Sequence, residues 1–120
     1  MGFDELEQFY RRHLMVDVMP FWERHAIDRE RGGIYTGIND DGSLSTTDKF
    51  VWSNARAIYT FSALYNHMGR DAKWLEIARN ICEFCLDHGR ERRGVWGYLL
   101  DREGRMLEGE KAIQVDAFAL

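Results

Sequence analysis

Two stretches of this chain repeat the same short motifs at an almost constant interval. The matching elements are Gly33-Ile34-Tyr35 with Gly94-Val95-Trp96, Gly42 with Gly104, and Lys49 with Lys111, at intervals of 61, 62 and 62 residues. A steady period of this size is typical of repeat architectures, in which each helical unit buries its apolar face against the next one. About three or more such units are normally needed for a stable core, and this sequence holds fewer than two. We therefore expect residues 1–120 to form a single partial domain, truncated within a longer repeat protein.

The helical segments are of two kinds. Residues 3–26 and 71–88 each carry apolar side chains every three or four positions, which predicts amphipathic helices with one wet face. Asp71 stands where an N-cap is expected, and Pro20 should kink the first helix or divide it in two. Residues 50–68 are apolar on nearly every side, which predicts a helix buried on both faces.

Turn-forming residues separate these helices. Residues 31–48 are rich in glycine and hold an Asp41-Gly42 pair after a short β-prone run, so we expect a small hairpin. The alternation predicts an all-α chain, in which outer amphipathic helices and inner apolar helices are joined by short hairpins.

Composition narrows the possible partners. The formal net charge is −4 and the isoelectric point is near 5.5, which argues against nucleic acid as the main partner. Purely apolar runs are only a few residues long, so no membrane span is expected. The first residues lack the basic and apolar regions of a secretory signal, and we expect a cytoplasmic protein.

The cysteines and histidines do not form a recognisable metal or redox site. Cys82 and Cys85 have C-x-x-C spacing, but they fall within a helix on its apolar stripe and no second pair exists, which favours buried structural thiols. The four histidines are expected at the surface or at helix ends: His13, His25, His67 and His88. No metal or other cofactor is therefore predicted.

One polar and aromatic strip runs along the apolar helix. Trp52 and Arg56 are four residues apart and share a face, which Thr60 extends by one turn. A guanidinium on such a helix is costly to bury without a partner or a wet cavity. Arg56 should therefore meet a carboxylate inside the protein or point into a ligand pocket, and Trp52 should pack in the core or stack on a sugar.

The order of these motifs resembles the opening of the N-acylglucosamine 2-epimerase family. The residues that carry the resemblance are Trp22, Asp28, Gly32-Gly33, the Asp-Gly turn, Lys49-x-x-Trp52-x-x-x-Arg56, Phe61-Ser62 and Ala117-Phe118. The resemblance implies the N-terminal third of an (α/α)6 barrel and a small-molecule sugar as the partner. It also implies proton transfer at sugar C2 through an enediolate, by histidines that lie beyond this chain.

The resemblance also implies a set of substrate-binding residues. Arg56 matches the family's pocket arginine, which would polarise the sugar oxygens, and Trp52 precedes it on the same face. Gln114 stands where many relatives carry an aromatic hydroxyl, and Asp116 follows it as a second polar group. We predict that these four residues bind the sugar and that residues 1–120 contain no catalytic acid or base.

Two other readings remain open at this point. Glycoside hydrolases with the same helical toroid would need paired carboxylates near Arg56, for which Asp116 is the visible candidate. A non-catalytic interaction module would place Arg56 in an internal salt bridge. Residues 1–120 alone would expose large apolar patches, so we also expect homo-oligomers or association through these faces.

Overall fold

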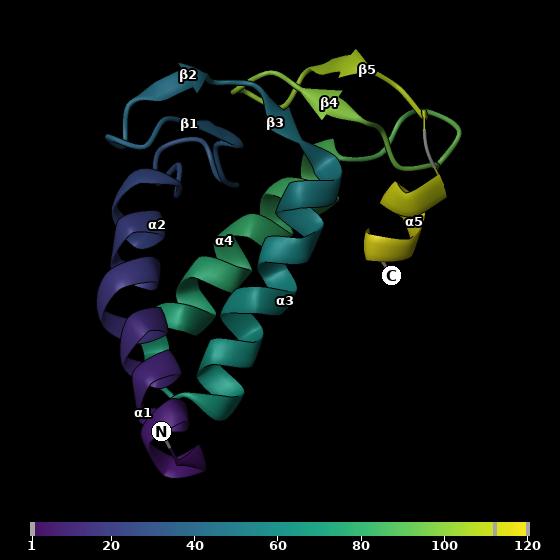
Figure 1. Ribbon diagram of the computed structural model, residues 1–120. Coiled ribbons are helices and arrows are strands. Elements are labelled where there is room, and N and C mark those ends of the chain that lie inside the picture. The colour runs from purple at the N-terminus through teal and green to yellow at the C-terminus, as the bar shows by residue number, and fades with distance from the viewer. Residues whose placement is uncertain (1, 112, 120) are drawn as a thin grey trace.

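The computed structural model describes residues 2–111 and 113–119. Three helical segments make one long rod at the N-terminus, and three further helices and five short strands follow (Figure 1). The elements are α1 (Phe3–Arg12), η1 (His13–Val18), α2 (Met19–His25), β1 (Gly37–Ile38), β2 (Leu44–Thr46), β3 (Lys49–Phe50), α3 (Val51–His67), α4 (Ala72–His88), β4 (Leu99–Leu100), β5 (Met106–Glu108) and α5 (Ile113–Ala119).

The helices and the strands occupy different parts of the molecule. The α1–η1–α2 rod and α3 lie on opposite sides of α4, and the strands lie across one end of the helices (Figure 1). β1 pairs with β2, while β3, β4 and β5 form a three-stranded antiparallel sheet. The all-α prediction is therefore correct only for the bulk of the chain, because the connecting segments form two small sheets. No helix in the described ranges is long and apolar enough to cross a membrane.

The first helix changes its hydrogen-bond pattern just before Pro20. The chain changes from α-helix to π-helix at His13 and returns to α-helix at Met19, one residue before the proline. Proline has no N–H to donate, and its ring clashes with the carbonyl four residues earlier. A π-helical turn absorbs such a mismatch without ending the helix. The helix is divided near Pro20, as predicted, by a change in its hydrogen-bond pattern.

The α3–α4 pair carries the core. Ile81 of α4 is fully buried, and Phe61 of α3 stacks on Trp74 with ring centroids 5.9 Å apart. The predicted N-cap is confirmed, because the Lys73 amide donates to the Asp71 carboxylate at 3.0 Å. Cys82 and Cys85 are free thiols on α4, and burial raises the pKa of the Cys85 thiol to about 12.

One flank of α3 is open to solvent, so the prediction that this helix is buried on both faces is wrong for this chain. Tyr59 is 76% exposed, and Arg56 and Thr60 are exposed beside it. α5 has seven residues and α3 has seventeen, so α5 runs beside only part of α3. The open flank is the one that carries the polar and aromatic strip.

The predicted repeat is confirmed, with a more exact register. Isolated bridges pair Ile27 with Ile34 and Arg90 with Trp96. From Ile34 and Trp96 onward the two units are 62 residues apart, whereas Ile27 and Arg90 are 63 apart, because the first loop holds one extra residue. Gly94 is therefore the counterpart of Gly32, and the sequence match to Gly33 was wrong by one position.

A histidine under each hairpin is repeated in the same way. His25 ends α2 and His88 ends α4, and each lies beside the phenylalanine one turn earlier, with ring centroids 4.8 and 5.0 Å apart. A Cβ on Gly42 would meet the His25 ring at 2.5 Å, and one on Gly104 would meet the His88 ring at 2.3 Å. Both glycines also have φ near +90°, which favours glycine. The two imidazoles are thus packed beneath the hairpins.

A buried ion cluster joins the two repeats. The side chains of Asp28 and Lys49 are 1% and 0% exposed, and Lys49 Nζ donates to the Asp28 carboxylate at 2.8 Å. Lys49 also donates to the carbonyl oxygens of Gly32 at 2.7 Å and Arg102 at 2.9 Å. The Arg102 guanidinium, from the second hairpin, donates to both oxygens of Asp28 at 3.0 and 3.3 Å. Every buried charge in this cluster is therefore paired.

The cluster sets the protonation state of its carboxyl group. Burial by itself would raise the pKa of Asp28, but hydrogen bonds from Arg102 and Lys49 outweigh burial and hold that pKa well below its usual range. Burial lowers the pKa of the Lys49 ammonium, and the Asp28 carboxylate opposes this effect. Asp28 is therefore ionised throughout the neutral range.

We predict that Lys49→Met lowers the free energy of unfolding by about 3–5 kcal/mol, because it removes one of the two cations that pair with the buried Asp28 carboxylate. Urea denaturation followed by circular dichroism measures the change. Lys111→Met is the matched control: Lys111 is the repeat counterpart of Lys49, but it is exposed, pairs with Glu108 at 3.1 Å and lies over the Tyr98 ring at 5.0 Å from its centroid. The control should lose no more than about 1 kcal/mol. Equal losses in the two variants would contradict the prediction.

The lowered pKa of Asp28 predicts a loss of stability in acid. A carboxyl group whose pKa is lower in the folded state stabilises that state fully above the unfolded pKa of about 3.9, and the stabilisation is lost as the pH falls toward the folded pKa. Asp28→Asn should therefore be less stable than the wild type at pH 7, and the difference should shrink between about pH 5 and pH 2. Urea midpoints across this range test the effect. Asp87→Asn, at an exposed carboxylate of α4, serves as the control, and a difference that does not vary with pH would refute the prediction.

Candidate functional site

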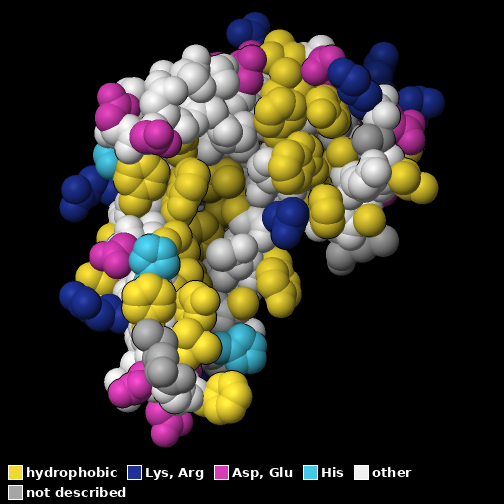
Figure 2. Space-filling view, in the orientation of Figure 1, with side chains coloured by type: hydrophobic (Ala, Val, Ile, Leu, Met, Phe, Trp, Pro, Cys, Tyr) yellow, Lys and Arg dark blue, Asp and Glu magenta, His cyan; other side chains and the backbone are white. Residues whose placement is uncertain are grey.

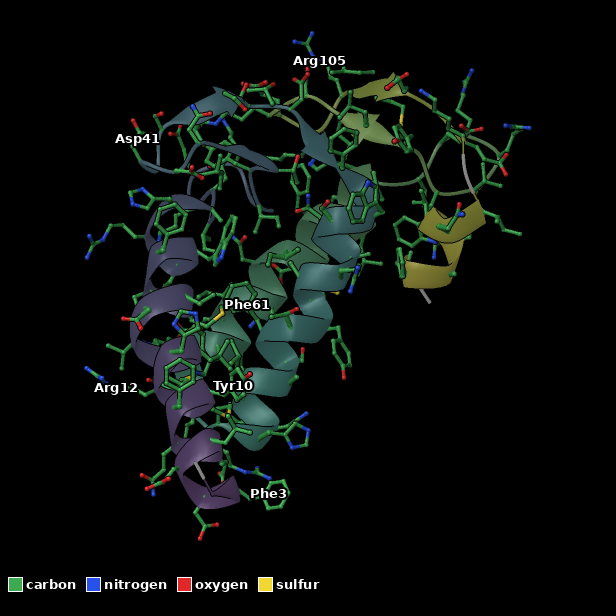
Figure 3. The ribbon with its side chains drawn as sticks, viewed as in Figure 1. Phe3, Tyr10, Arg12, Asp41, Phe61 and Arg105 are labelled. Carbon is green, nitrogen blue, oxygen red and sulfur yellow. The ribbon has the colours of Figure 1, made fainter. Side chains whose placement is uncertain are left out.

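Arg56 contributes to the lining of two neighbouring hollows. One hollow of about 470 Å³ separates the N-terminal rod from α3, and Trp22, Trp52 and Arg56 contribute to its lining. A second hollow of about 330 Å³ lies between α3 and α5, and Arg56 and Phe118 contribute to its walls. Figure 2 shows hydrophobic side chains gathered between the rod and α3. Figure 3 places Phe61 in the same space, facing the rod.

Trp52 lies in the first turn of α3 and contributes to the lining of the larger hollow. Its indole is half-buried and lies between two phenylalanines, with ring centroids 6.3 Å from Phe50 and 6.4 Å from Phe118. The β3 strand immediately before α3 pairs with β4, which fixes the point where the helix begins. One part of the Trp52 ring thus packs against these phenylalanines and the remainder lines an open hollow, while stacking on a sugar stays a prediction.

Arg56 has no carboxylate partner within the described parts of the chain. Its guanidinium instead lies over the ring of Phe118, with Cζ 5.2 Å from the ring centroid. The Thr60 hydroxyl donates to the Arg56 carbonyl at 3.2 Å, so its hydrogen bond is made within α3. Neither hollow beside Arg56 is lined by Asp or Glu. Of the two alternatives for this arginine, the described contacts favour the open pocket.

Gln114 and Asp116 lie in α5, and the repeat explains their positions. Gln114 is exposed and corresponds to Trp52, 62 residues earlier. Asp116 is half-buried and corresponds to Asn54 in the same register. The structure therefore places the four predicted binding residues on two neighbouring inner helices, with Arg56 and Trp52 on one and Gln114 and Asp116 on the other.

Asn54 is a structural residue that the sequence did not single out. It is buried, and its amide oxygen accepts the Ile34 N–H at 2.7 Å, while its amide nitrogen donates to the Phe50 carbonyl at 3.0 Å. Asp116 makes the equivalent bond, because its carboxylate accepts the Trp96 N–H at 3.4 Å. The 62-residue register between Asn54 and Asp116 was the signal that would have revealed this shared role. A sugar contact by Asp116 stays a prediction, and it would use the second carboxylate oxygen.

The cysteines and the remaining titratable groups do not build a second site. No cluster of three or more His, Cys, Asp or Glu side chains among the described residues has the geometry to hold a metal ion. Cys82 and Cys85 line a hollow between α3, α4 and α5 that shares Phe118 with the hollow beside Arg56, but Arg56 itself is not part of its lining. The candidate binding residues of the described chain therefore lie on the exposed strip of α3 and on the neighbouring helix α5.

Comparison with known proteins defines the class of this architecture. The chain superposes on a cellobiose 2-epimerase from Bacillus thermoamylovorans with a TM-score of 0.87 at 21% identity, over 96% of this chain and 30% of that one. It also superposes on a sugar epimerase from a ruminal bacterium with a TM-score of 0.84 at 25% identity, over 93% and 29%. The fold is thus that of a portion of an (α/α)6 barrel.

The sequence comparisons identify the family. The family model described as N-acylglucosamine 2-epimerase (GlcNAc 2-epimerase) matches residues 32–120. A cellobiose 2-epimerase of Bacteroides fragilis is 31% identical over 118 residues, which is 96% of this chain and 30% of that protein. The chain belongs to the N-acylglucosamine 2-epimerase family, and it spans about 30% of the length of this curated relative.

The equivalence of Asp116 and Asn54 predicts that Asp116→Asn is tolerated. An asparagine oxygen accepts the Trp96 N–H as Asn54 accepts that of Ile34, so the free energy of unfolding should change by no more than about 0.5 kcal/mol. Asp116→Ala removes the acceptor and should cost about 1–3 kcal/mol, because it leaves a half-buried N–H unpaired. Thermal unfolding of both variants tests this. Equal losses for the two substitutions would show that the hydrogen bond has no structural role.

Proposed function

We propose that the protein carrying this chain is a sugar 2-epimerase or aldose–ketose isomerase, which moves a proton at C2 of a small sugar through an enediolate. The family membership supports a sugar-isomerising enzyme in general terms. The observation that carries the proposal is Arg56: a guanidinium with no described carboxylate partner, flanked by aromatic rings and lining two hollows.

The position of Arg56 suits the chemistry of an enediolate. Removal of the C2 proton places negative charge on the oxygen of the neighbouring carbonyl. A guanidinium presents five N–H donors in a rigid plane and stays ionised at all relevant pH values. In the proposed mechanism Arg56 donates to the sugar oxygens at C1 and C2, and its interaction strengthens as the enediolate forms.

The neighbouring residues supply the remaining contacts of the proposal. Trp52 offers an apolar surface one helical turn before Arg56, against which a sugar ring can stack. Gln114 is exposed in the first turn of α5, and its amide can donate to one hydroxyl and accept from another. In this arrangement Asp116 adds a contact through the carboxylate oxygen that does not accept the Trp96 N–H.

In this proposal, the acid and base come from outside residues 1–120. His25 and His88 are packed against hairpin glycines, and His13 and His67 lie on the exposed parts of η1 and α3. None of the four histidines lines either hollow beside Arg56. The two bases that a C2 proton transfer needs are therefore assigned to further repeats of the protein.

The other two readings of the sequence have less support. A glycoside hydrolase needs two carboxyl groups facing the substrate, whereas the hollows beside Arg56 have no acidic lining among the described residues. An interaction module was expected to hold Arg56 in an internal salt bridge, and the described ion pairs do not include this residue. Association through exposed apolar faces stays a prediction for residues such as Phe3 and Phe9.

The proposal predicts isotope exchange that depends on Arg56. The complete protein, incubated with candidate aldoses in heavy water, should place deuterium at C2. Arg56→Ala should lower kcat/KM about 10²–10³-fold, the usual cost of removing a donor to a developing oxyanion. Because Arg56 is exposed, the same substitution should change the free energy of unfolding by only about 0.5 kcal/mol.

The matched control is Arg79→Ala. Arg79 is an exposed arginine of α4 that is paired with Glu83 on the helix surface at 2.8 Å. Its removal should leave exchange unchanged. An active Arg56→Ala protein with a strongly lowered melting temperature would mark Arg56 as structural, and an absence of exchange with every aldose tested would sink the proposed activity.

A further inference from the structure

We infer that Phe118 is a positioning residue for Arg56, which holds the guanidinium over its ring and leaves the N–H donors free for a sugar. The inference deepens the proposed function and rests on it. Phe118 lies on α5 and is 42% exposed, so its ring is available at the surface of the hollow. It lies 5.2 Å from Arg56 Cζ and lines the same hollow between α3 and α5.

The ring belongs to an aromatic group that spans two helices. Phe118 also lies against Trp52, with ring centroids 6.4 Å apart and planes inclined by 42°. Trp52 is in turn fixed by Phe50 at the end of β3. Phe118 therefore lies against both Trp52 and Arg56 of α3. It is the described residue whose ring links Arg56 to α5.

The chemical nature of the partner determines what Arg56 can still do. A carboxylate at this position would occupy two guanidinium N–H groups and neutralise the charge. An aromatic face attracts the cation through its quadrupole and uses no N–H group that points outward from the guanidinium edge. Arg56 thus keeps both its donors and its charge, which are the properties that stabilise a developing oxyanion.

The two units carry different side chains at position 118 and at its repeat counterpart. In the 62-residue register Phe118 corresponds to Arg56 itself, and Gln114 corresponds to Trp52. Asn54 lies between Trp52 and Arg56, and Asp116 lies between Gln114 and Phe118. These two residues have the same role in both units, because each accepts a loop N–H. The two helices therefore share an anchoring position, whereas arginine on α3 is replaced by phenylalanine on α5 at the position that lines the hollow between them.

The test compares substitutions that remove or retain the ring in the complete protein. Phe118→Leu keeps an apolar side chain but removes the aromatic face, and we expect kcat/KM for C2 exchange to fall about 3- to 30-fold. The loss should fall mainly on kcat, because the positioned guanidinium interacts most strongly in the transition state. Phe118→Tyr retains the ring and should keep activity within about twofold of the wild type.

A double-mutant cycle separates positioning from general packing. In an Arg56→Ala background, Phe118→Leu should have almost no further effect on exchange, because the group that it positions is gone. Phe9→Leu on α1 is the matched control, since Phe9 is also a partly exposed phenylalanine but lies far along the chain from the strip. This control should retain wild-type kcat and KM.

A readout independent of catalysis tests the contact itself. In the ¹⁵N spectrum of the protein, Phe118→Leu should shift the Arg56 Nε–H resonance through loss of the ring current, and Phe9→Leu should leave it unchanged. An unchanged Arg56 resonance overturns the inference, and so does full activity of Phe118→Leu in an active enzyme. An inactive wild type whose Arg56 resonance does shift refutes the proposed function and, with it, the positioning role toward a sugar, although the contact itself is then established.

Discussion

The placement of every residue at the candidate site depends on the buried pair of Asp28 and Lys49. The pair joins the loop after α2 to β3, the strand that leads into α3, and Arg102 of the second hairpin also bonds to Asp28. Two charges buried in this way are costly unless both are fully hydrogen-bonded, and each is: Lys49 makes three bonds, while Asp28 accepts from two cations and the loop backbone. This cluster and the pairing of β3 with β4 together hold the residues just before α3, the helix that carries Trp52 and Arg56.

The two repeats keep the hydrogen bonds and packing that hold their loops and hairpins, but only the first repeat has the buried lysine. Asn54 and Asp116 hold equivalent loops, and His25 and His88 lie under equivalent glycines. By contrast, Lys49 is buried and ionically paired, while Lys111 is exposed and bonds to Glu108 on the surface. The same helix–hairpin–helix unit is therefore held together in both repeats even though the lysine before its second helix is buried in one repeat and exposed in the other.

Much of this fold was predictable because local patterns determine it. The helical periodicity located the amphipathic helices, Asp71 marked a helix start, and the glycine-rich segments gave the hairpins. Other features depend on contacts distant in sequence. A lysine rarely reads as a core residue, so the burial of Lys49 became visible only with Asp28 and Arg102 around it. The apolar character of α3 predicted burial on both faces, but residues 1–120 supply no described neighbour for one flank. The binding role assigned to Asp116 took no account of a loop amide that lies 20 residues earlier in the chain.

The electrostatics of the chain distinguish Arg56 from its other charged residues near the core. Within the described residues, every buried side-chain polar atom has a hydrogen-bond partner. The buried polar groups therefore need no contact from Arg56. Arg56 takes no part in that network, and its described partner is an aromatic ring rather than a carboxylate. The exposed guanidinium keeps its charge and its N–H donors accessible. These are the properties that the proposed contact with the oxygens of a sugar requires.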